Sequence, residues 1–388
     1  MSKFKKICTV TGSRAEYGLL SRLLLKLKKD KFFHLQLIVT GSHLSSKYGS
    51  TVNEISKDLI KIDRKIDLKL FNDTSQGIGK SMSIALTGLV KNYEQLKPDI
   101  ILLLGDRYEI LIAAIAATLC RIPIGHIHGG ELTEGVIDDV FRHSITKMSH
   151  IHFAATEKYK KRIIQMGESP KNVHCVGGLG VDSIQNKKLL NKKKLEEELK
   201  LKFLKKSILV TYHPETLSKK SSQNNFKHLI NALKKLKDTT IIFTMPNSDM
   251  ESSTITKLIK NFISLKKNSF LIKSLGQKNY YSCCKQVNCM IGNSSSGLLE
   301  MPSFKKFSIN IGSRQKGRIK ATSVIDCKPN SNDILKCLNF VFNENNQKKL
   351  KNIINPYGNG GAAKKITLIL KKIKFMKIIH KKFFDLNQ

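Results

Sequence analysis

The chain has 388 residues, a length that one hydrophobic core rarely organises, so we expect two domains. Hydrophobic residues make up 40% of it, which is enough for packed cores and excludes a largely disordered protein. Lysine and arginine total 68 against 30 aspartates and glutamates, a formal net charge of +38.

This basic excess raises the class of nucleic-acid-binding proteins, because clustered cations neutralise phosphates. However, the charge is mostly lysine distributed along the chain, and no helix-turn-helix, RNP or aromatic-interleaved pattern accompanies it. The lysine-rich stretches lie at 26–31, 187–206, 219–237 and 364–382. We therefore expect a solvated, lysine-rich surface and no nucleic-acid partner.

Targeting and cysteine patterns point to the cytosol. No apolar run approaches the roughly 18 residues that a membrane-spanning helix needs. The apolar stretch at 7–10 is too short for the core of a signal peptide and is typical of a β-strand. None of the eight cysteines has CxxC spacing, so they indicate neither a zinc site nor a redox motif. We expect a cytoplasmic protein with free thiols and no membrane association.

Short apolar runs alternate with longer amphipathic segments, a pattern typical of βα units around a parallel sheet. The strands expected in the first half are 6–10, 35–40, 100–104, 122–126 and 151–154. Helices are expected between them, for example at 15–28 and 109–119. The strands expected in the second half are 207–211, 240–244, 270–272, 289–291 and 307–310.

A charged stretch at 186–206 is predicted to be a helical, polar connector between two α/β domains. The chain breaks again at 355–361, and a basic amphipathic helix follows. In such a protein the carboxyl ends of both parallel sheets would face a cleft, because helix N-termini and glycine-rich turns gather at that edge.

Two turns in the first half place polar side chains directly after expected strands. Gly12 and Arg14 follow the first strand, where a turn at a helix N-terminus offers backbone N–H groups to an anion. Asp106 and Arg107 follow the apolar strand at 100–104, at the edge where ligands bind in this architecture. An ordinary βα turn and an N-cap aspartate would show the same residues, and capping is compatible with catalysis.

The densest polar cluster lies at 125–147 and combines imidazoles with carboxylates. Its members are His126, His128, Glu131, Glu134, Asp138, Asp139, Arg142 and His143. A metal site is one interpretation, but two glycines follow His128 and no HExxH motif is present. A solvated polar loop is another. We favour an acid/base cluster, because neighbouring carboxylates and imidazoles push their pKa values apart. Arg142 and His143 are expected to open a helix behind this loop and to orient the carboxylates.

Polar side chains also follow strands in the second half. His213 comes after the strand at 207–211 and precedes a proline, and Asn247 follows the strand at 240–244. A purely structural histidine is the alternative for His213.

A Gly/Ser turn at 292–297 joins an apolar strand to a helix. Backbone N–H groups and the hydroxyls of Ser294 and Ser295 would cradle a phosphate there without a lysine. Glu300 is expected about one turn into the helix, within reach of vicinal ribose hydroxyls. Arg314 follows the next strand and would add a cationic wall. A flexible linker is the alternative, and the apolar residues on both sides argue against it.

With these segments assembled, the chain resembles the hydrolysing UDP-N-acetylglucosamine 2-epimerase family. The resemblance covers nearly the whole length and is greatest to the bacterial members that feed sialic acid and legionaminic acid synthesis. The motifs that carry it are TGSRAEYG, GDRYE, HIHGGE, RHSITKMSH, YHPET, GNSSSGLLE, NIGSRQKGR and NPYGNGG.

The resemblance implies a glycosyltransferase-B-type α/β fold with two Rossmann-like domains facing across a cleft. We place the first domain at 1–180, the second at 181–355, and a C-terminal helix at 356–388 that returns to the first domain. The resemblance also implies a UDP-sugar substrate in the cleft and no cofactor, and the residue pattern itself leads us to expect no metal. We expect a homo-oligomer, either a dimer or a tetramer.

Site residues follow from the same resemblance. The residues that would hold UDP are Arg14, His213, Ser294, Ser295, Glu300 and Arg314, and we add Asn247. The acid/base candidates are Asp106, Glu131, Asp138 and His128, supported by Arg107, Arg142 and His143. In some relatives a glutamate occupies the place of His128. Glu131 is therefore our candidate for the base, followed by His128.

The implied reaction removes the C2 proton while UDP leaves C1, and water then adds with inversion at C2 to release N-acetylmannosamine. The base must be desolvated and the departing diphosphate needs preorganised positive charge. An alternative substrate is UDP-2,4-diacetamido-2,4,6-trideoxyglucose, of the legionaminic acid branch, which the loop at 133–139 favours. A glycosyltransferase of the same fold is a further alternative, because a fold does not fix a function.

Overall fold

The computed structural model describes residues 4–46, 49–72, 74–134, 136–185, 187–214, 221–246 and 252–386. The chain forms two compact units. The first unit comprises Met1–Glu131, Asp138–Gln185 and Tyr357–Gln388, and the second comprises Leu132–Ile137 and Asn186–Pro356. Asn247, one of the expected nucleotide-binding residues, lies outside the described residues.

The first unit is built on a seven-stranded sheet with the order β3-β2-β1-β4-β5-β6-β7. All neighbouring strands pair in parallel. The strands are β1 Lys5–Thr11, β2 Phe33–Thr40, β3 Arg64–Ile66, β4 Ile100–Leu104, β5 Ile124–Ile127, β6 Ile151–Ala154 and β7 Val173–Cys175. Strand order reverses between β1 and β4, the position at which open α/β sheets bind ligands.

Helices cover both faces of this sheet. They are α1 Arg14–Lys29, α2 Val52–Lys57, α3 Ser75–Leu96, α4 Tyr108–Leu119, α5 Asp138–Met148, α6 Glu157–Gln165, α7 Leu179–Gln185, α15 Ala362–Lys372 and α16 Phe375–Ile378, with short 3₁₀ turns η1 Gly41–Leu44 and η3 Pro170–Asn172. One core packs α1, α7 and α15 on one face, and a second packs α3, α4 and α5 on the other. Because both faces are covered, β4 consists entirely of buried apolar residues.

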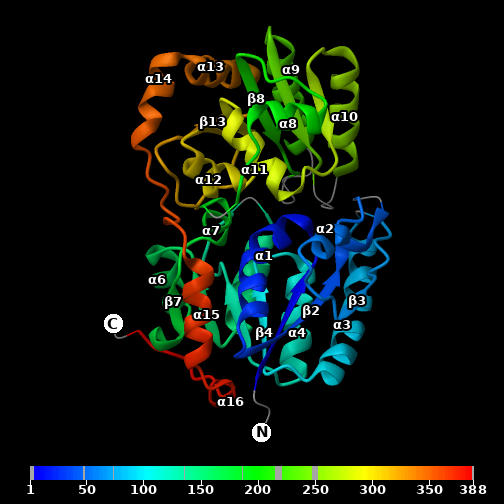
Figure 1. Ribbon diagram of the computed structural model, residues 1–388, viewed down its shortest axis with the longest axis vertical. Coiled ribbons are helices and arrows are strands. Elements are labelled where there is room, and N and C mark those ends of the chain that lie inside the picture. The colour runs from blue at the N-terminus through cyan, green and yellow to red at the C-terminus, as the bar shows by residue number, and fades with distance from the viewer. Residues whose placement is uncertain are drawn as a thin grey trace. The chain divides into compact units, whose positions relative to one another are not determined.

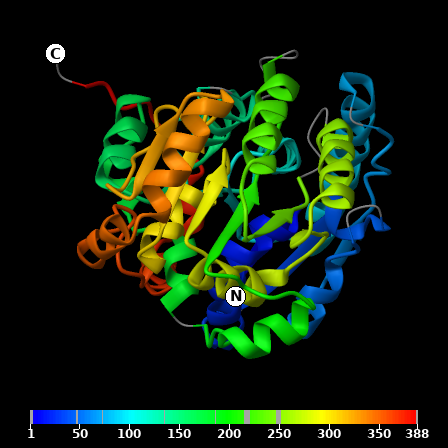
Figure 2. The same cartoon turned by 90° about the horizontal axis from the view of Figure 1, so that it is seen from above.

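The second unit has a six-stranded parallel sheet with the order β10-β9-β8-β11-β12-β13. Its strands are β8 Lys206–Thr211, β9 Thr239–Thr244, β10 Ser269–Ile272, β11 Cys289–Gly292, β12 Phe307–Ile311 and β13 Val324–Cys327. Its helices are α8 Lys192–Leu199, α9 Ser221–Lys234, α10 Ser252–Leu265, α11 Gly276–Gln286, α12 Ser296–Leu299, α13 Ser331–Phe342 and α14 Glu344–Lys348, with 3₁₀ turns η4 Met301–Phe304 and η5 Lys349–Asn352. Figure 2 shows these helices, coloured green to orange, around the strands.

The last helices of the chain belong to the first unit. Helix α15 contacts α1 and α7, and Figure 1 shows it in red-orange beside α1. Asp182 of α7 accepts hydrogen bonds from the backbone N–H groups of Gly361 and Ala363, at 2.7 and 2.8 Å. The first unit therefore contains segments from both ends of the sequence.

Several boundaries differ from those expected. The units divide after Gln185 and not at residue 180, because α7 packs on α1 and α15 of the first unit. The expected connector contains α8, which packs on the second unit through Leu195. The prediction that Arg142 and His143 open a helix is wrong, since α5 already begins at Asp138.

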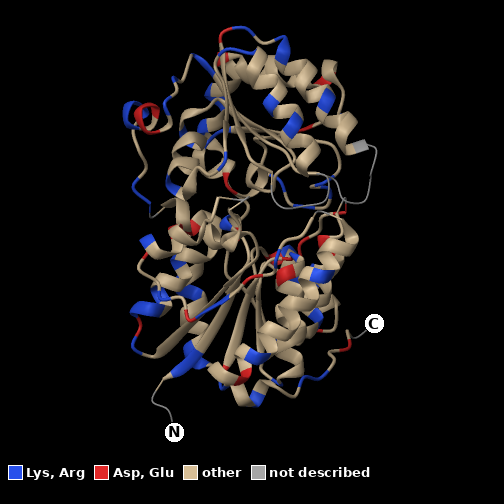
Figure 3. Cartoon of the chain, turned by 90° about the vertical axis from the view of Figure 1, so that its right-hand side faces the viewer, with Lys and Arg blue, Asp and Glu red and all other residues tan. Residues whose placement is uncertain are grey.

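The basic surface is distributed as expected. Figure 3 shows lysine and arginine along helices, strands and loops of both units. Within the described ranges, no helix combines the length and apolar character needed to cross a bilayer. All eight cysteines lie in described segments, and each is a free thiol.

Candidate active site

Arg142 is the centre of a polar cluster in the first unit. It projects from α5 with only 1% of its surface exposed. One terminal nitrogen pairs with the carboxylate of Asp106, and the other lies 2.7 Å from Asp139 Oδ1 and donates to the carbonyl of Glu131 at 2.9 Å. Burial disfavours the charge, but the carboxylates of Asp106, Glu131 and Asp139 raise the pKa of Arg142 above its usual range. The guanidinium therefore stays charged and holds two acidic side chains at fixed positions.

Asp106 owes its place to the end of β4. Gly105 turns the chain there with φ at +83°, and its N–H donates to the carbonyl of Ile127. The carbonyl of Gly105 accepts from Nε2 of His126 at 2.8 Å. Burial lowers the pKa of His126 to about 3, so this imidazole is neutral and structural. The Asp106 side chain keeps 23% exposure and so remains accessible to a substrate.

His128 and Glu131 form a second pair in the same unit. Nδ1 of His128 lies 3.0 Å from Oε1 of Glu131, whose side chain is 1% exposed. The backbone N–H of Leu179, at the start of α7, donates to Nε2 of His128 at 3.3 Å. Because Nε2 accepts this bond, the imidazole proton lies on Nδ1, the ring nitrogen nearer to Glu131. The pair is thus held in a single orientation by α7.

The remaining residues expected at this site are placed around the same sheet edge. Asp138 opens α5, and Nε2 of His143 lies 3.5 Å from Oδ2 of Asp139. Arg107 pairs with the buried carboxylate of Glu109 at 3.2 Å.

Arg14 lies in the first turn of α1, which Ser13 caps through its side chain. Glu134, in contrast, belongs to the second unit and forms an exposed pair with Lys316. Among the described residues, no three His, Cys, Asp or Glu side chains come together as ligands for a metal ion.

In the second unit, Asn293 joins three turns that carry expected nucleotide-binding residues. Its side chain accepts from the N–H of His213 and donates to the carbonyl of His213, both at 2.8 Å. Its carbonyl accepts from Arg314 at 3.1 Å and from Gln315 at 2.8 Å. The preceding Gly292 has φ at +143°, and a Cβ there would lie 2.0 Å from the carbonyl oxygen of Thr211. Only glycine lets β11 approach β8 so closely at this edge.

The carboxylate of Glu300 is held by two hydroxyls. Oε1 accepts from Tyr281 at 2.9 Å, and Oε2 accepts from Ser296. Tyr280 in turn donates to Ser296 at 2.6 Å. Glu300 does not lie inside the helix as expected, because α12 ends at Leu299 and Glu300 caps it. The two tyrosines belong to α11 and were missed, since nothing in their local sequence signals a nucleotide site.

These features define a class of protein: two Rossmann-like units, each with polar side chains at the carboxyl edge of a parallel sheet, in a glycosyltransferase-B-type fold. Residues 25–371 match the family model described as UDP-N-acetylglucosamine 2-epimerase, and the chain belongs to this enzyme family. The family and fold class predicted from the sequence are thereby confirmed.

Two of three similar relatives, each matched over nearly its whole length, are named as hydrolysing 2-epimerases. The chain is 44% identical over 100% of its length and 100% of the relative's to the GDP/UDP-N,N'-diacetylbacillosamine 2-epimerase (hydrolyzing) of Campylobacter jejuni. It is 40% identical to the polysialic acid biosynthesis protein P7 of Escherichia coli, over 99% of this chain and 98% of the relative. It is 37% identical to the UDP-N,N'-diacetylbacillosamine 2-epimerase (hydrolyzing) of Legionella pneumophila, over 95% of this chain and 96% of the relative.

Among solved structures, the UDP-GlcNAc 2-epimerase of Neisseria meningitidis bound to UDP-GlcNAc superposes with a TM-score of 0.79. The match covers 95% of this chain and 100% of that one at 22% identity. At this identity, the likeness shows the shared fold alone.

Proposed function

We propose that this enzyme is a hydrolysing 2-epimerase of UDP-N,N'-diacetylbacillosamine, the 2,4-diacetamido-2,4,6-trideoxyglucose nucleotide. The observation that carries this proposal is the 44% identity, over the whole of both chains, to a relative named for this reaction. The proposal is supported by the cluster around Arg142, whose carboxylates and imidazole would provide the acidic and basic groups that such a reaction needs. The product would enter the synthesis of sialic-acid-type sugars.

In this proposal, residues of the first unit carry out the chemistry. A base removes the C2 proton, the C–H electrons form a C1=C2 double bond, and the C1–O bond to UDP breaks. Water then adds its hydroxyl to C1 while a proton is delivered to the opposite face of C2, which releases the free epimer. Glu131 is the proposed base, because its carboxylate is shielded from bulk water and lies beside His128.

The other first-unit groups support that base. His128 lies beside Glu131, with Nδ1 3.0 Å from Oε1, and the N–H of Leu179 holds its other ring nitrogen in place. Asp106 and Asp138 are the proposed partners for the return of the proton and for the orientation of water. Arg142 holds the carboxylate of Asp106 in place.

Residues of the second unit would bind the nucleotide. Ser294, Ser295 and Arg314 are proposed to contact the diphosphate, and His213 is placed beside them by Asn293. Glu300 would accept the ribose hydroxyls with a carboxylate already oriented by Tyr281. Arg14, at the N-terminus of α1, is proposed as a further phosphate contact.

UDP-N-acetylglucosamine remains the second candidate substrate, and the 40% identity to a protein named for polysialic acid biosynthesis favours it. The deciding experiment incubates the purified protein with UDP-N,N'-diacetylbacillosamine, GDP-N,N'-diacetylbacillosamine and UDP-N-acetylglucosamine, each without an acceptor. Released sugars are identified by NMR. We expect the 2-epimer of the diacetamido sugar, with one deuterium at C2 when the solvent is D₂O.

Other outcomes of this experiment have definite meanings. N-acetylmannosamine as the main product would transfer the proposal to the second candidate. Free sugar that keeps its C2 configuration and C2 hydrogen would contradict epimerisation. Turnover only after an acceptor is added would instead indicate a glycosyltransferase.

The expected dimer or tetramer stays a prediction that light scattering can test.

A further inference from the structure

A lysine close to the C-terminus caps the helix that carries Arg142. Helix α5 ends at Met148, and Nζ of Lys381 donates to the carbonyls of Lys147 and Ser149, at 2.5 and 2.8 Å. Carbonyl groups at a helix C-terminus carry partial negative charge and lack partners within the helix. The ammonium group therefore stabilises this end of α5 from a segment more than 200 residues away in sequence.

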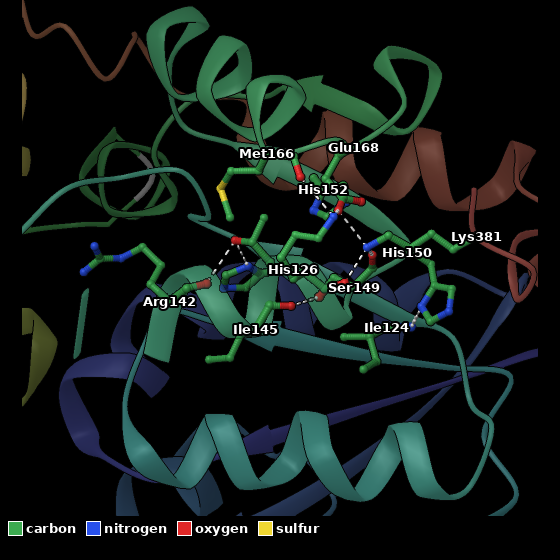
Figure 4. A network of polar contacts seen from close by, with 12 residues as sticks. Ile124, His126, Arg142, Ile145, Ser149, His150, His152, Met166, Glu168 and Lys381 are labelled. Atoms are coloured by element: carbon green, nitrogen blue, oxygen red, sulfur yellow. Dashed lines mark hydrogen bonds and ion pairs between the residues drawn. The ribbon is translucent and has the colours of Figure 1, made fainter. Parts of the chain in front are cut away.

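Lys381 is held there by a buried carboxylate. Oε1 of Glu168 lies 2.8 Å from Nζ of both Lys381 and Lys147, and Oε2 lies 3.0 Å from Nε2 of His152. Figure 4 shows Glu168 between His152 and Lys381. Burial alone would raise the pKa of Glu168. The hydrogen bonds from His152, Lys147 and Lys381 outweigh this effect and lower the pKa to about 2. The carboxylate is therefore ionised, and Lys381 is one of the groups that balance its charge.

The chain around Lys381 follows a fixed path. The N–H of Phe384 donates to the carbonyl of Gly167 at 3.0 Å. The ring of Phe383 lies 4.8 Å from Nζ of Lys147. Gly167 has φ at +84°, and a Cβ at this position would lie 2.3 Å from the Phe383 ring. The segment at 379–386, which we call the C-terminal strap, is thus packed against the end of α5.

The same helix reaches the candidate active site. Arg142, which pairs with Asp106, lies six residues before the last residue of α5. Thr146 donates to the carbonyl of Arg142 at 3.0 Å and lies 3.1 Å from Nδ1 of His126, whose other nitrogen fixes Gly105. Figure 4 shows Arg142, Ile145 and Ser149 in turn along the end of α5, where Ser149 donates to the carbonyl of Ile145 at 2.7 Å. A shift of α5 along its axis would move Arg142 away from Asp106.

We propose that Lys381 is a positioning residue for the reaction: the C-terminal strap fixes α5, and α5 fixes Arg142 against Asp106. The proposal rests on the proposed function only for its effect on turnover. We expect no direct effect of the strap on nucleotide binding, because none of the residues expected to bind UDP lies on α5.

The test compares Lys381→Met with Lys382→Met in the full-length protein. Lys382 is exposed and adjacent, so it controls for the loss of one charge. For Lys381→Met we expect kcat to fall about tenfold while KM and the Kd for UDP change less than about twofold. Lys382→Met should match the wild type, and Lys381→Arg, which keeps the cation, should recover most of the loss.

Amide hydrogen exchange gives a readout that does not depend on the substrate. Exchange at 143–149 should rise in Lys381→Met and stay unchanged in α9 of the second unit. If exchange at α5 is unaltered, the strap does not hold this helix and the proposal is overturned. If exchange rises but kcat does not change, the positioning role is wrong. If even the wild type releases no sugar, the proposed function fails, while the exchange result still decides whether the strap fixes α5.

Discussion

At the scale of single residues, the candidate chemistry depends on how Arg142 is shared between Asp106 and Asp139. A guanidinium presents donors in a rigid planar fork, so both carboxylates are fixed relative to each other. A lysine at this position could not hold both in the same geometry.

Replacing Asp106 by asparagine should separate catalysis from binding. We expect kcat to fall at least about a hundredfold, because the amide cannot hold or deliver a proton as the carboxylate does. The Kd for UDP, measured by calorimetry, should stay within about twofold of the wild type. Asp385→Asn, at an exposed position, is the matched control. A variant that keeps turnover but loses UDP affinity would reverse the division of labour proposed above.

Tyr281 offers the complementary test in the second unit. Tyr281→Phe removes the hydroxyl that donates to Glu300, so the carboxylate loses a fixed orientation while its charge is kept. We expect the Kd for UDP to rise about fivefold, with kcat at saturating substrate nearly unchanged. Tyr93→Phe, which removes a buried hydroxyl in the first unit, is the control. Equal effects of the two variants would mean that Tyr281 has only a structural role.

Some of the candidate site residues could be predicted from the sequence because they directly follow a strand, and others could not. Asp106 and His213 follow apolar strands that are easy to recognise, and parallel topology then brings such ends to one edge. Tyr281 and the pairing of His128 with the backbone of Leu179 depend on contacts between segments distant in sequence. No local pattern encodes these contacts, so they could only be found in the structure.

At the scale of elements, the same distinction holds. The strand β4 was predicted to the residue, because both faces of the sheet are covered and its apolar run is continuous. The strands β3, β7 and β13 were not predicted. Each is three or four residues long and lies at a sheet edge, where one neighbour determines the pairing.

Helix α5 shows a different cause of error. Its start was placed at Arg142, although Asp138 and Asp139 are favoured in a first helical turn because they interact with the free N–H groups there. Asp138 and Asp139 were interpreted only as members of an acid/base cluster, so their contribution to the start of α5 was overlooked.

The attachment of α15 can be tested through Asp182. Its carboxylate accepts from two N–H groups at the start of α15, so Asp182→Ala leaves both unpaired. We expect the free energy of unfolding to fall by about 1–2 kcal/mol, measured by urea denaturation. Asp182→Asn keeps one acceptor and should lose less. A change below about 0.5 kcal/mol for the alanine variant would show that packing alone holds α15.

At the scale of the whole molecule, buried histidines make stability depend on pH. Burial lowers the pKa of His126 to about 3 and those of His43 and His150 to about 4, and all three lie in the first unit. Unfolding restores ordinary values near 6.5, so the unfolded chain binds protons that the folded chain does not. This contribution to stability is complete above about pH 6.5 and is lost as the pH falls, toward 4 for His43 and His150 and toward 3 for His126.

We expect calorimetric unfolding of the first unit to move to lower temperature between pH 7.5 and pH 5. For His126 alone, the loss is about 1.4 kcal/mol for each pH unit below 6.5. His150→Asn keeps an acceptor for the N–H of Ile124 but cannot titrate, so it should reduce the shift. His34→Asn, at an exposed position, should not. An unfolding temperature that is constant over this range would contradict the assignment of neutral buried histidines.

The membership of α15 and the C-terminal strap in the first unit has a consequence for synthesis on the ribosome. Translation proceeds from the N-terminus, so residues 186–356 emerge before α15 does. The second unit can therefore complete its sheet and cores while the first still lacks its last helix and the lysine that caps α5. The first unit is thus begun first and completed last, and until α15 emerges the apolar surface of α1 and α7 lacks the helix that covers it.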